Sequence, residues 1–397
     1  MAELTHKIDR AAGVAVLDVD SFLVTPGLID LHVHFREPGQ EAKETIATGA
    51  AAAAAGGFTT VCAMPNTVPV VDTPDRVRFV VERGRAAVGA HVLPIAAATA
   101  GSLGREPTDA ARLRAAGAVA LSDDGLPIAS AEILARVLAG ARAAGVVVAD
   151  HCEERRLSAG GAVLAGPVAE RLNVRGIPPE AESAAVARDL EVVAEVGGRL
   201  HLCHLSTMES VRLLRSAQEE GLAVTAEVCP HHLTMSTSII VERGSDAKMN
   251  PPLATDADRE TLVTALADGT IGCVATDHAP HTLAEKARGL ADAPFGVVGL
   301  ETAFAVLHTG LVKKDRIPLA TLIERLTVGP ARAFGLKGGR LAPGAPADVS
   351  VFDLTAEWTV DSAAFRSKGR NTPWEGHRLR GRPVLTIVGG EVVFDGR

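Results

Sequence analysis

Two histidines one residue apart, His32 and His34, close an apolar run that begins at Leu28. In an extended strand, residues i and i+2 point to the same side, so both imidazoles would leave the strand end together. Imidazole is a common ligand of zinc and related divalent ions. A single His-x-His pair is weak evidence for a metal site, but this pair is the first of a series.

Other residues with metal-binding side chains end later strand-like runs of the chain: Asp123-Asp124, His151, His204 and Asp277. A single histidine at a strand end is more often structural, but a whole set in this order is hard to obtain by accident. Four histidines and two carboxylates can hold two ions with one bridging ligand. A hydroxide shared by two ions is a strong nucleophile at neutral pH. We therefore predict a metal-dependent hydrolase in which Asp277 also accepts a proton from the attacking water.

Several neighbouring residues allow more than one interpretation. His231 and His232 follow a strand-like run and are either ligands or structural residues. His201 lies early in its run and is better interpreted as a packing residue. Cys152 and Cys203 stand beside predicted ligands and are interpreted as small buried hydrophobic residues rather than nucleophiles.

Eight short apolar runs alternate with helix-favouring segments and would position these residues. The predicted strands cover 28–34, 59–64, 91–98, 118–124, 146–151, 200–204, 224–229 and 273–277, and the predicted helices include 44–55, 131–144, 182–196, 210–220 and 256–267. Eight strand-helix units in series predict a (β/α)8 TIM barrel, an α/β fold whose active site lies at the C-terminal strand ends. A doubly wound open sheet is the alternative, but no GxGxxG or P-loop pattern opens any of these helices.

The two chain ends predict a second, smaller unit. Residues 339–353 have the pattern of a turn followed by a strand, and 379–388 lead through Gly389-Gly390 into 391–394 as a hairpin. Residues 14–17 are also strand-like. We expect residues 1–26 and 338–397 to form a small β-domain beside a barrel of residues 27–337.

The composition argues against several classes of protein. A net charge of −8, 3% aromatic residues and the absence of tyrosine disfavour nucleic-acid binding. No run approaches the roughly 20 apolar residues of a membrane span, and the N-terminus lacks the apolar core of a signal peptide. We therefore predict a cytoplasmic protein. The 5 cysteines form no CxxC pair, and a disulfide framework is not expected in the reducing cytoplasm.

The chain lacks a lysine where many binuclear barrel hydrolases use one. These enzymes bridge their ions with a carbamylated lysine on strand four, but no lysine occurs between Lys43 and Lys248. Asp123-Asp124 ends the fourth predicted strand, so an aspartate bridge is the natural substitute. Strand alternation allows only one of these two aspartates to face inward and does not itself choose between them.

With these residues identified, the chain resembles the type I bacterial dihydroorotases of the amidohydrolase superfamily over nearly its whole length. The motifs that carry the resemblance are Asp30-Leu-His-Val-His-Phe-Arg-Glu-Pro-Gly39, Ala63-Met-Pro-Asn-Thr67, Leu121-Ser-Asp-Asp-Gly125, His151-Cys-Glu153, His201-Leu-Cys-His-Leu-Ser206, Lys248-Met-Asn-Pro-Pro252, Ala275-Thr-Asp-His-Ala-Pro-His281 and Arg370-Asn-Thr-Pro-Trp374.

The resemblance implies a role for each matching residue. One or two Zn²⁺ ions are implied, and the ligands would be His32, His34 and Asp277 at one site and His151 and His204 at the other, with Asp124 bridging. It is the resemblance, not the spacing, that selects Asp124 over Asp123. The substrate carboxylate would be held by Arg36, Asn66 and His281, and the ring would be contacted by Asn250 and the backbone at Phe295 and Gly296. His34 would be both a metal ligand and a substrate contact.

The implied reaction is the reversible hydrolysis of L-dihydroorotate to N-carbamoyl-L-aspartate, the third step of de novo pyrimidine biosynthesis. A hydantoinase or allantoinase is an alternative, although those relatives generally use the missing lysine bridge. A non-catalytic scaffold of aspartate transcarbamoylase is another alternative, and the filled ligand positions argue against it. The resemblance also implies a homodimer and makes docking with aspartate transcarbamoylase plausible for the active enzyme.

Overall fold

The computed structural model describes residues 16–128 and 130–397. All eight predicted barrel strands form, and they lie in one parallel sheet in the order β11-β10-β9-β6-β5-β4-β3-β2. Their bounds are β2 Leu28–Val33, β3 Phe58–Ala63, β4 His91–Ala96, β5 Ala120–Leu121, β6 Val147–Asp150, β9 Leu200–Leu202, β10 Val224–Val228 and β11 Cys273–Val274. The prediction of a (β/α)8 barrel is confirmed.

Contacts just beyond the last strand close the sheet between its first and last members. His34 N donates to His278 O at 2.9 Å, and Val33 forms a parallel bridge with His278. Deeper in the same seam, the buried Asp30 carboxylate accepts hydrogen bonds from Thr276 N and, at 2.6 Å, from Thr276 Oγ1. The barrel therefore brings the segment after β11 against β2 and the residues that follow it, although Asp30 and Thr276 are 246 residues apart in the chain.

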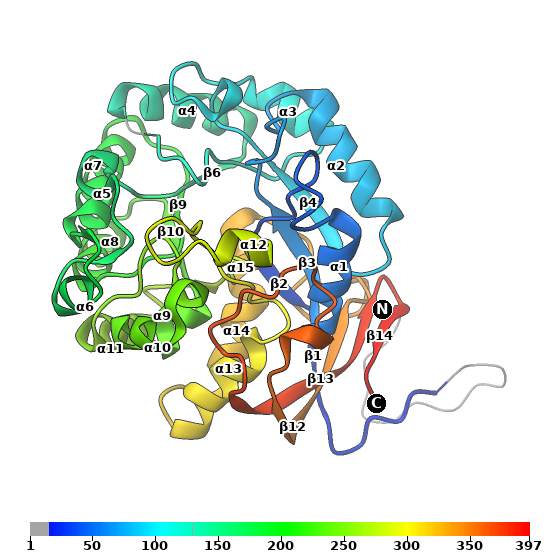
Figure 1. The fold of residues 1–397 in the computed structure, drawn as a ribbon. Helices are drawn as coiled ribbons and strands as arrows, with labels where there is room; N and C mark the ends of the chain where they lie inside the picture. Colours follow the sequence, from blue (N-terminus) through cyan, green and yellow to red (C-terminus); the bar gives the residue numbers. More distant parts are fainter. Residues whose placement is uncertain (1–15, 129) are drawn as a thin grey trace.

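Helices surround the strands as an outer ring (Figure 1). All six residues of β2 are buried, as expected for a strand covered on both faces. The helices are α1 Ile46–Ala55, α2 Pro74–Ala86, α3 Ala110–Ala116, α4 Ala131–Ala144, α5 Arg155–Ser158, α6 Pro167–Arg171, α7 Glu180–Val196, α8 Met208–Glu219, α9 Pro230–Thr234, α10 Ile240–Arg243, α11 Asp256–Asp268, α12 Leu283–Lys286, α13 Ala303–Gly310, α14 Leu319–Leu326 and α15 Val328–Phe334. A short parallel pair, β7 Val163–Leu164 and β8 Gly176–Ile177, lies between α5 and α7.

Helix α4 illustrates how local sequence sets these boundaries. Ser130 caps its N-terminus by accepting a hydrogen bond from Ile133 N. Gly145 ends it in the left-handed conformation with φ 69°, which glycine adopts without steric cost. Both bounds match the predicted range.

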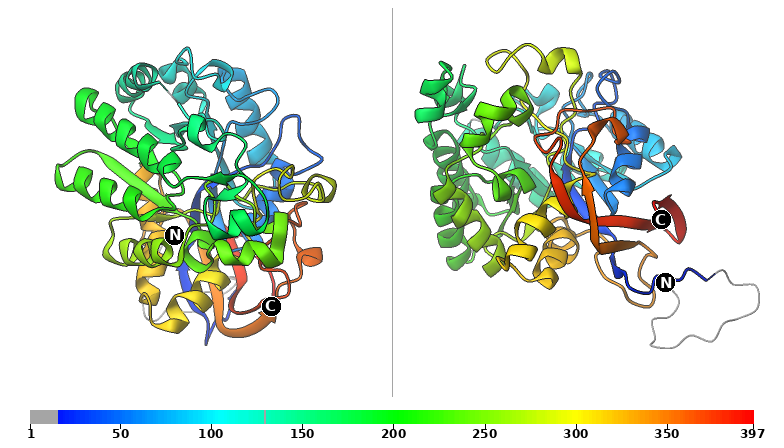
Figure 2. Two further views of the ribbon diagram at one scale, coloured as in Figure 1. Left: turned by 60° about the vertical axis from the view of Figure 1, so that its left-hand side comes forward. Right: turned by 60° about the horizontal axis from the view of Figure 1, so that its bottom comes forward.

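The second unit is a four-stranded antiparallel sheet in the order β1-β12-β13-β14 (Figure 2). Its strands are β1 Leu23–Pro26, β12 Val349–Thr359, β13 Arg378–Val388 and β14 Glu391–Asp395. Ser350 Oγ donates to Gly57 O at 2.6 Å, which ties the sheet to the turn before β3. A Cβ at Gly57, where φ is 85°, would lie 2.7 Å from the Phe352 ring, so this close approach requires glycine. The predicted β-domain is confirmed.

The N-terminal strand lies later than predicted. Of the predicted range 14–17, Val14 and Ala15 fall outside the described residues. Val16 and Leu17 are 56% and 41% exposed and form no strand, so the prediction is wrong there. The strand begins at Leu23 because Leu23–Pro26 pairs with the first four residues of β12, a partner more than 300 residues away.

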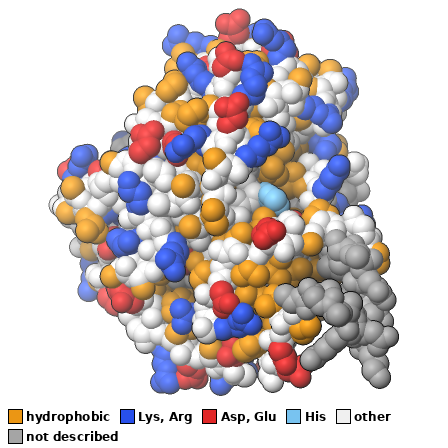
Figure 3. Space-filling model, turned by 90° about the vertical axis from the view of Figure 1, so that its right-hand side faces the viewer, with side chains coloured by type: hydrophobic (Ala, Val, Ile, Leu, Met, Phe, Trp, Pro, Cys, Tyr) orange, Lys and Arg blue, Asp and Glu red, His pale blue; other side chains and the backbone are white. Residues whose placement is uncertain are grey.

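The face beside this sheet carries Lys and Arg side chains interspersed with Asp and Glu (Figure 3). No single-sign patch dominates that view. Among residues 16–128 and 130–397, no helix combines the length and apolarity needed to cross a bilayer.

Candidate active site

The C-terminal strand ends bring the predicted metal ligands together around Asp124. Its Oδ1 lies 3.3 Å from His32 Nε2 and 3.5 Å from His204 Nε2. Its Oδ2 lies 3.4 Å from His34 Nε2. Asp277 Oδ1 is 3.0 Å from His34 Nε2 and 3.6 Å from His32 Nε2. One carboxylate thus faces three imidazoles from two different strand ends.

His151 joins this cluster of predicted ligands from the end of β6. Its Nδ1 lies 2.9 Å from His204 Nε2 and 3.7 Å from Asp124 Oδ1. Its Nε2 points away from the cluster, 3.4 Å from Glu153 Oε2 and 3.1 Å from Asn250 Nδ2. The ring therefore has one nitrogen for a ligand role and one for orientation.

Of the two adjacent aspartates, only Asp124 faces the cluster. Asp123 accepts hydrogen bonds from Thr99 N at 3.0 Å and from Thr99 Oγ1. Successive residues of an extended chain point to opposite sides, so only one of the two can reach the barrel axis. The structure places Asp123 in a structural position.

The residues present fit a divalent cation. His32 Nε2 and Asp124 Oδ1 are buried, and neither has a hydrogen-bond partner among the described residues. A buried polar atom without a partner costs about 1–3 kcal/mol. An ion between these atoms would satisfy both, and imidazole nitrogen and carboxylate oxygen are suitable ligands.

Both carboxylates of the cluster are ionised at neutral pH. Burial opposes ionisation of Asp124, but the charge of His32 and the close ring nitrogens of His204 and His32 outweigh it and hold the pKa of Asp124 well below its usual range. Burial likewise opposes ionisation of Asp277. The hydrogen bond from His34 and the charge of His32 outweigh it and lower the pKa of Asp277.

Glu227 on β10 is a candidate that the sequence interpretation missed. Its Oε1 accepts a hydrogen bond from His32 Nδ1 at 2.8 Å, and its Oε2 lies 3.1 Å from His201 Nε2. His201 Nδ1 in turn lies 2.8 Å from Thr225 Oγ1. Burial would raise the pKa of Glu227, but hydrogen bonds from His201 and His32 outweigh it and lower it to about 2. The sequence signal that could have identified Glu227 is its position as a charged residue within an otherwise mostly apolar predicted strand.

We expect the change Glu227→Gln to lower affinity for metal by roughly 10- to 100-fold, because a carboxylate behind a ligand histidine fixes its tautomer and orientation. The measurement is competitive metal binding against a chelating dye. Glu182→Gln is the matched control, since Glu182 is also buried but its hydrogen bonds go to Ser206 and Thr207. Equal metal affinities in Glu227→Gln and the unmodified protein would contradict this role.

A cleft of about 600 Å³, part of it open to solvent, lies in front of the cluster. Five of the six predicted ligands line it, and His32 lies behind them with no exposed surface. All the remaining residues predicted to contact substrate also line it: Arg36, Asn66, Asn250, His281, Phe295 and Gly296. The cleft thus joins residues from eight separate segments of the chain.

The cleft carries one permanent positive charge. Burial lowers the pKa of Arg36 to about 10, so its guanidinium is protonated at neutral pH. Burial, with the charges of Arg36 and Lys43 next, lowers the pKa of His281 to about 3, so this ring is neutral. His281 Nε2 donates to Phe295 O at 2.8 Å, and Arg36 Nε donates to Pro280 O at 3.3 Å. These bonds fix both side chains before substrate arrives.

Three residues that line the cleft have left-handed backbone conformations although none of them is glycine. The φ angles are 60° at Arg36, 34° at His204 and 48° at Asp277. Such conformations cost about 1–3 kcal/mol each and concentrate at functional sites. The backbone is therefore strained at these three residues, where the chain leaves the strand ends and enters the wall of the cleft.

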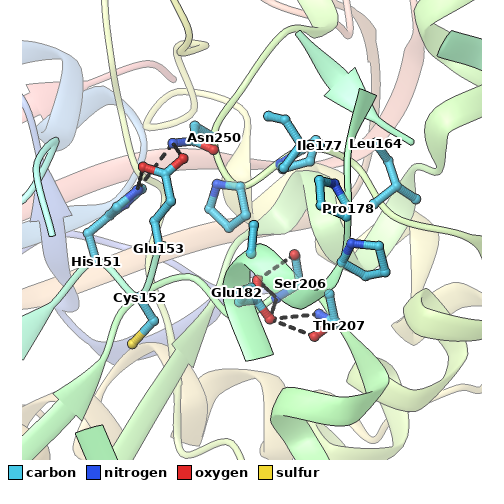
Figure 4. Close-up of a pocket in the computed structure, with 14 residues that line it drawn as sticks. His151, Cys152, Glu153, Leu164, Ile177, Pro178, Glu182, Ser206, Thr207 and Asn250 are labelled. Carbon is cyan, nitrogen blue, oxygen red and sulfur yellow. Dashed lines mark hydrogen bonds and ion pairs between the residues drawn. The ribbon is translucent and has the colours of Figure 1, made fainter. Parts of the chain in front are cut away.

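A smaller pocket of about 310 Å³ shares His151 and Asn250 with the cleft (Figure 4). In this view Asn250 lies beside Glu153, and Asn250 Nδ2 donates to Glu153 Oε1 at 3.2 Å. Glu182 forms another wall and accepts hydrogen bonds from Ser206 and Thr207. Glu153 and Asn250, which both contact His151 Nε2, are thus held by a hydrogen bond to each other.

Comparison with known proteins gives the site its context. The Dihydro-orotase-like family model matches residues 21–210. The dihydroorotase of Geobacillus thermodenitrificans is 50% identical over 396 residues, covering 100% of this chain and 92% of that protein. The dihydroorotase of Anaeromyxobacter sp. strain K is 50% identical over 397 residues with the same coverage.

The chain belongs to the dihydroorotase family. It is a cyclic amide hydrolase, and the family together with the buried His and Asp groups implies a divalent metal ion. The family predicted from the motifs is therefore confirmed.

Solved structures of other cyclic amide hydrolases share the fold. The L-hydantoinase (dihydropyrimidinase) from Arthrobacter aurescens aligns with a TM-score of 0.86 at 27% identity, over 94% of this chain and 86% of that one. A D-hydantoinase from Bacillus sp. AR9 aligns with a TM-score of 0.84 at 24% identity, over 100% of this chain and 90% of that one. The latter likeness supports the fold alone.

Proposed function

We propose that the chain catalyses the reversible hydrolysis of L-dihydroorotate to N-carbamoyl-L-aspartate, as a type I dihydroorotase. The observation that carries this proposal is the cleft itself, in which the Arg36 guanidinium lies in the same 600 Å³ space as the Asp124 cluster. A substrate with a carboxylate beside a cyclic amide matches this combination. A hydantoin ring carries no carboxylate for Arg36.

We propose that zinc is the native metal. His32, His34 and Asp277 would hold one ion and His151 and His204 another, with Asp124 bridging. When bound, such ions polarise a carbonyl oxygen and lower the pKa of water. The orphaned His32 Nε2 and Asp124 Oδ1 support this assignment.

The remaining steps, substrate binding and proton transfer, would be carried out by side chains and backbone groups of the cleft. Arg36, with Asn66 and His281, would hold the substrate carboxylate and so fix which ring amide faces the cluster. Asn250 and the backbone at Phe295 and Gly296 would contact the ring. Water adds to the amide carbonyl carbon, the C–N bond breaks, and Asp277 takes a proton from the water and delivers it to the departing nitrogen.

We expect turnover of L-dihydroorotate and N-carbamoyl-L-aspartate, and little or none of hydantoin and allantoin, when the purified protein meets all four in parallel. Activity should be lost on chelation and restored by zinc. Steady-state assays with metal analysis of the same sample make the measurement. Turnover of hydantoin alone would replace this proposal with a hydantoinase, and bound metal without turnover would favour a scaffold.

The family resemblance supports three further proposals. These are a cytoplasmic location, a homodimer, and docking with aspartate transcarbamoylase. We also propose the domain limits: the small β-domain comprises residues 1–26 and 338–397, and the barrel comprises residues 27–337. Sedimentation of the protein alone and mixed with aspartate transcarbamoylase tests the two assembly proposals together.

A further inference from the structure

A second group of metal-binding side chains lies beside the Asp124 cluster and has no part in the proposed reaction. Cys229, His231 and His232 follow β10 at the start of α9. One ligand atom from each lies within 4.8 Å of the other two. All three side chains are buried, at 0–2% exposure.

Strand parity explains the direction of Cys229, and the turn into α9 brings the two histidines next to it. Glu227 and Cys229 are two residues apart at the end of β10 and point to the same side. Glu227 reaches His32, so Cys229 also faces the interior. Pro230 then begins α9, and this turn stacks the next two residues, His231 and His232, edge to face with ring centroids 4.4 Å apart.

Three ring nitrogens in this group are unsatisfied. His231 Nδ1, His231 Nε2 and His232 Nδ1 are buried and have no hydrogen-bond partner among the described residues. His232 Nε2 donates to Pro251 O at 3.0 Å, which fixes that ring and leaves Nδ1 as the basic nitrogen. Each buried polar atom without a partner costs about 1–3 kcal/mol. A bound ion or an enclosed water would relieve this cost.

We propose that Cys229, His231 and His232 bind a further zinc-type ion, separate from the cluster at Asp124. A thiolate with two imidazoles is a donor set that favours zinc or cadmium over harder cations. Donors around a tetrahedral zinc lie about 3.5 Å apart, so small side-chain rotations would bring the three atoms into range. Binding would displace the proton of the Cys229 thiol and leave a fourth coordination position open.

Cobalt substitution tests the proposal through sulfur itself. The full-length chain is stripped of metal and titrated with Co²⁺. A thiolate ligand gives a near-ultraviolet sulfur-to-cobalt charge-transfer band that nitrogen and oxygen ligands do not. We expect this band in the unmodified protein and its loss in Cys229→Ser, together with a loss of one ion per chain by elemental analysis.

Cys203→Ser is the matched control, because Cys203 is equally buried and lies in a different candidate group with His32 and Glu227. The band should survive in this variant. Loss of the band in Cys203→Ser with survival in Cys229→Ser would place the ion beside His32 and overturn the proposal. The absence of a band in the unmodified protein would also overturn it.

His231→Asn keeps the thiol and so provides a second test if Cys229→Ser does not fold. We expect a shifted band and at least 10-fold weaker binding of the last cobalt equivalent. An unchanged titration would contradict the proposal. These readouts are absorption and metal content, so they are independent of whether dihydroorotate is the substrate.

Discussion

Replacing Asp277 with asparagine is expected to abolish turnover of dihydroorotate while substrate binding stays measurable. The Asp277 carboxylate lies 3.0 Å from His34 Nε2, lines the cleft and is ionised at neutral pH. Asparagine keeps the shape but cannot accept the proton of the attacking water. General acid–base residues contribute about 10²- to 10⁴-fold, so we expect kcat to fall by at least that much. Single-turnover kinetics and equilibrium binding of substrate separate the two effects.

Asp123→Asn is the control for this variant. Asp123 is a buried aspartate next to Asp124, but its hydrogen bonds go to Thr99 rather than to the cluster. Its replacement should lower thermal stability more than kcat. Metal content must be measured in both variants, because Asp277 is also a proposed ligand. Full activity in Asp277→Asn with normal metal content would remove Asp277 from the mechanism.

The barrel could be predicted because its signals are local. Each strand is a short apolar run, and the predicted ligands stand where those runs end. Helix α4 could be bounded to the residue because Ser130 and Gly145 are strong cap signals. The N-terminal strand was predicted at the wrong place because its position depends on pairing with β12. The local sequence at Leu23–Pro26 carries no signal that predicts this pairing.

The site shows the same division between local and long-range information. The residues that cluster around Asp124 could be picked out in the sequence as predicted ligands, but which of Asp123 and Asp124 faces them depends on strand register. Glu227 was missed because its importance arises from contact with His32, 195 residues away. His201, interpreted as a packing residue, is buried as expected, yet its Nε2 lies 3.1 Å from the Glu227 carboxylate. Orienting contacts between strands are not encoded by spacing within one strand.

Arg36→Ala is expected to raise the KM for dihydroorotate by roughly 10- to 150-fold, since hydrogen bonds to charged groups contribute about 1.5–3 kcal/mol. The effect should be confined to substrates with a carboxylate, so kcat/KM for dihydrouracil, the same ring without that group, should change little. Arg83→Ala is the control, because Arg83 is half-exposed and pairs with Glu37 outside the cleft. Equal losses for both substrates would mean that Arg36 supports the cleft wall. An unchanged KM for dihydroorotate would refute its role as the carboxylate clamp, and with it the main reason for preferring dihydroorotate over a hydantoin.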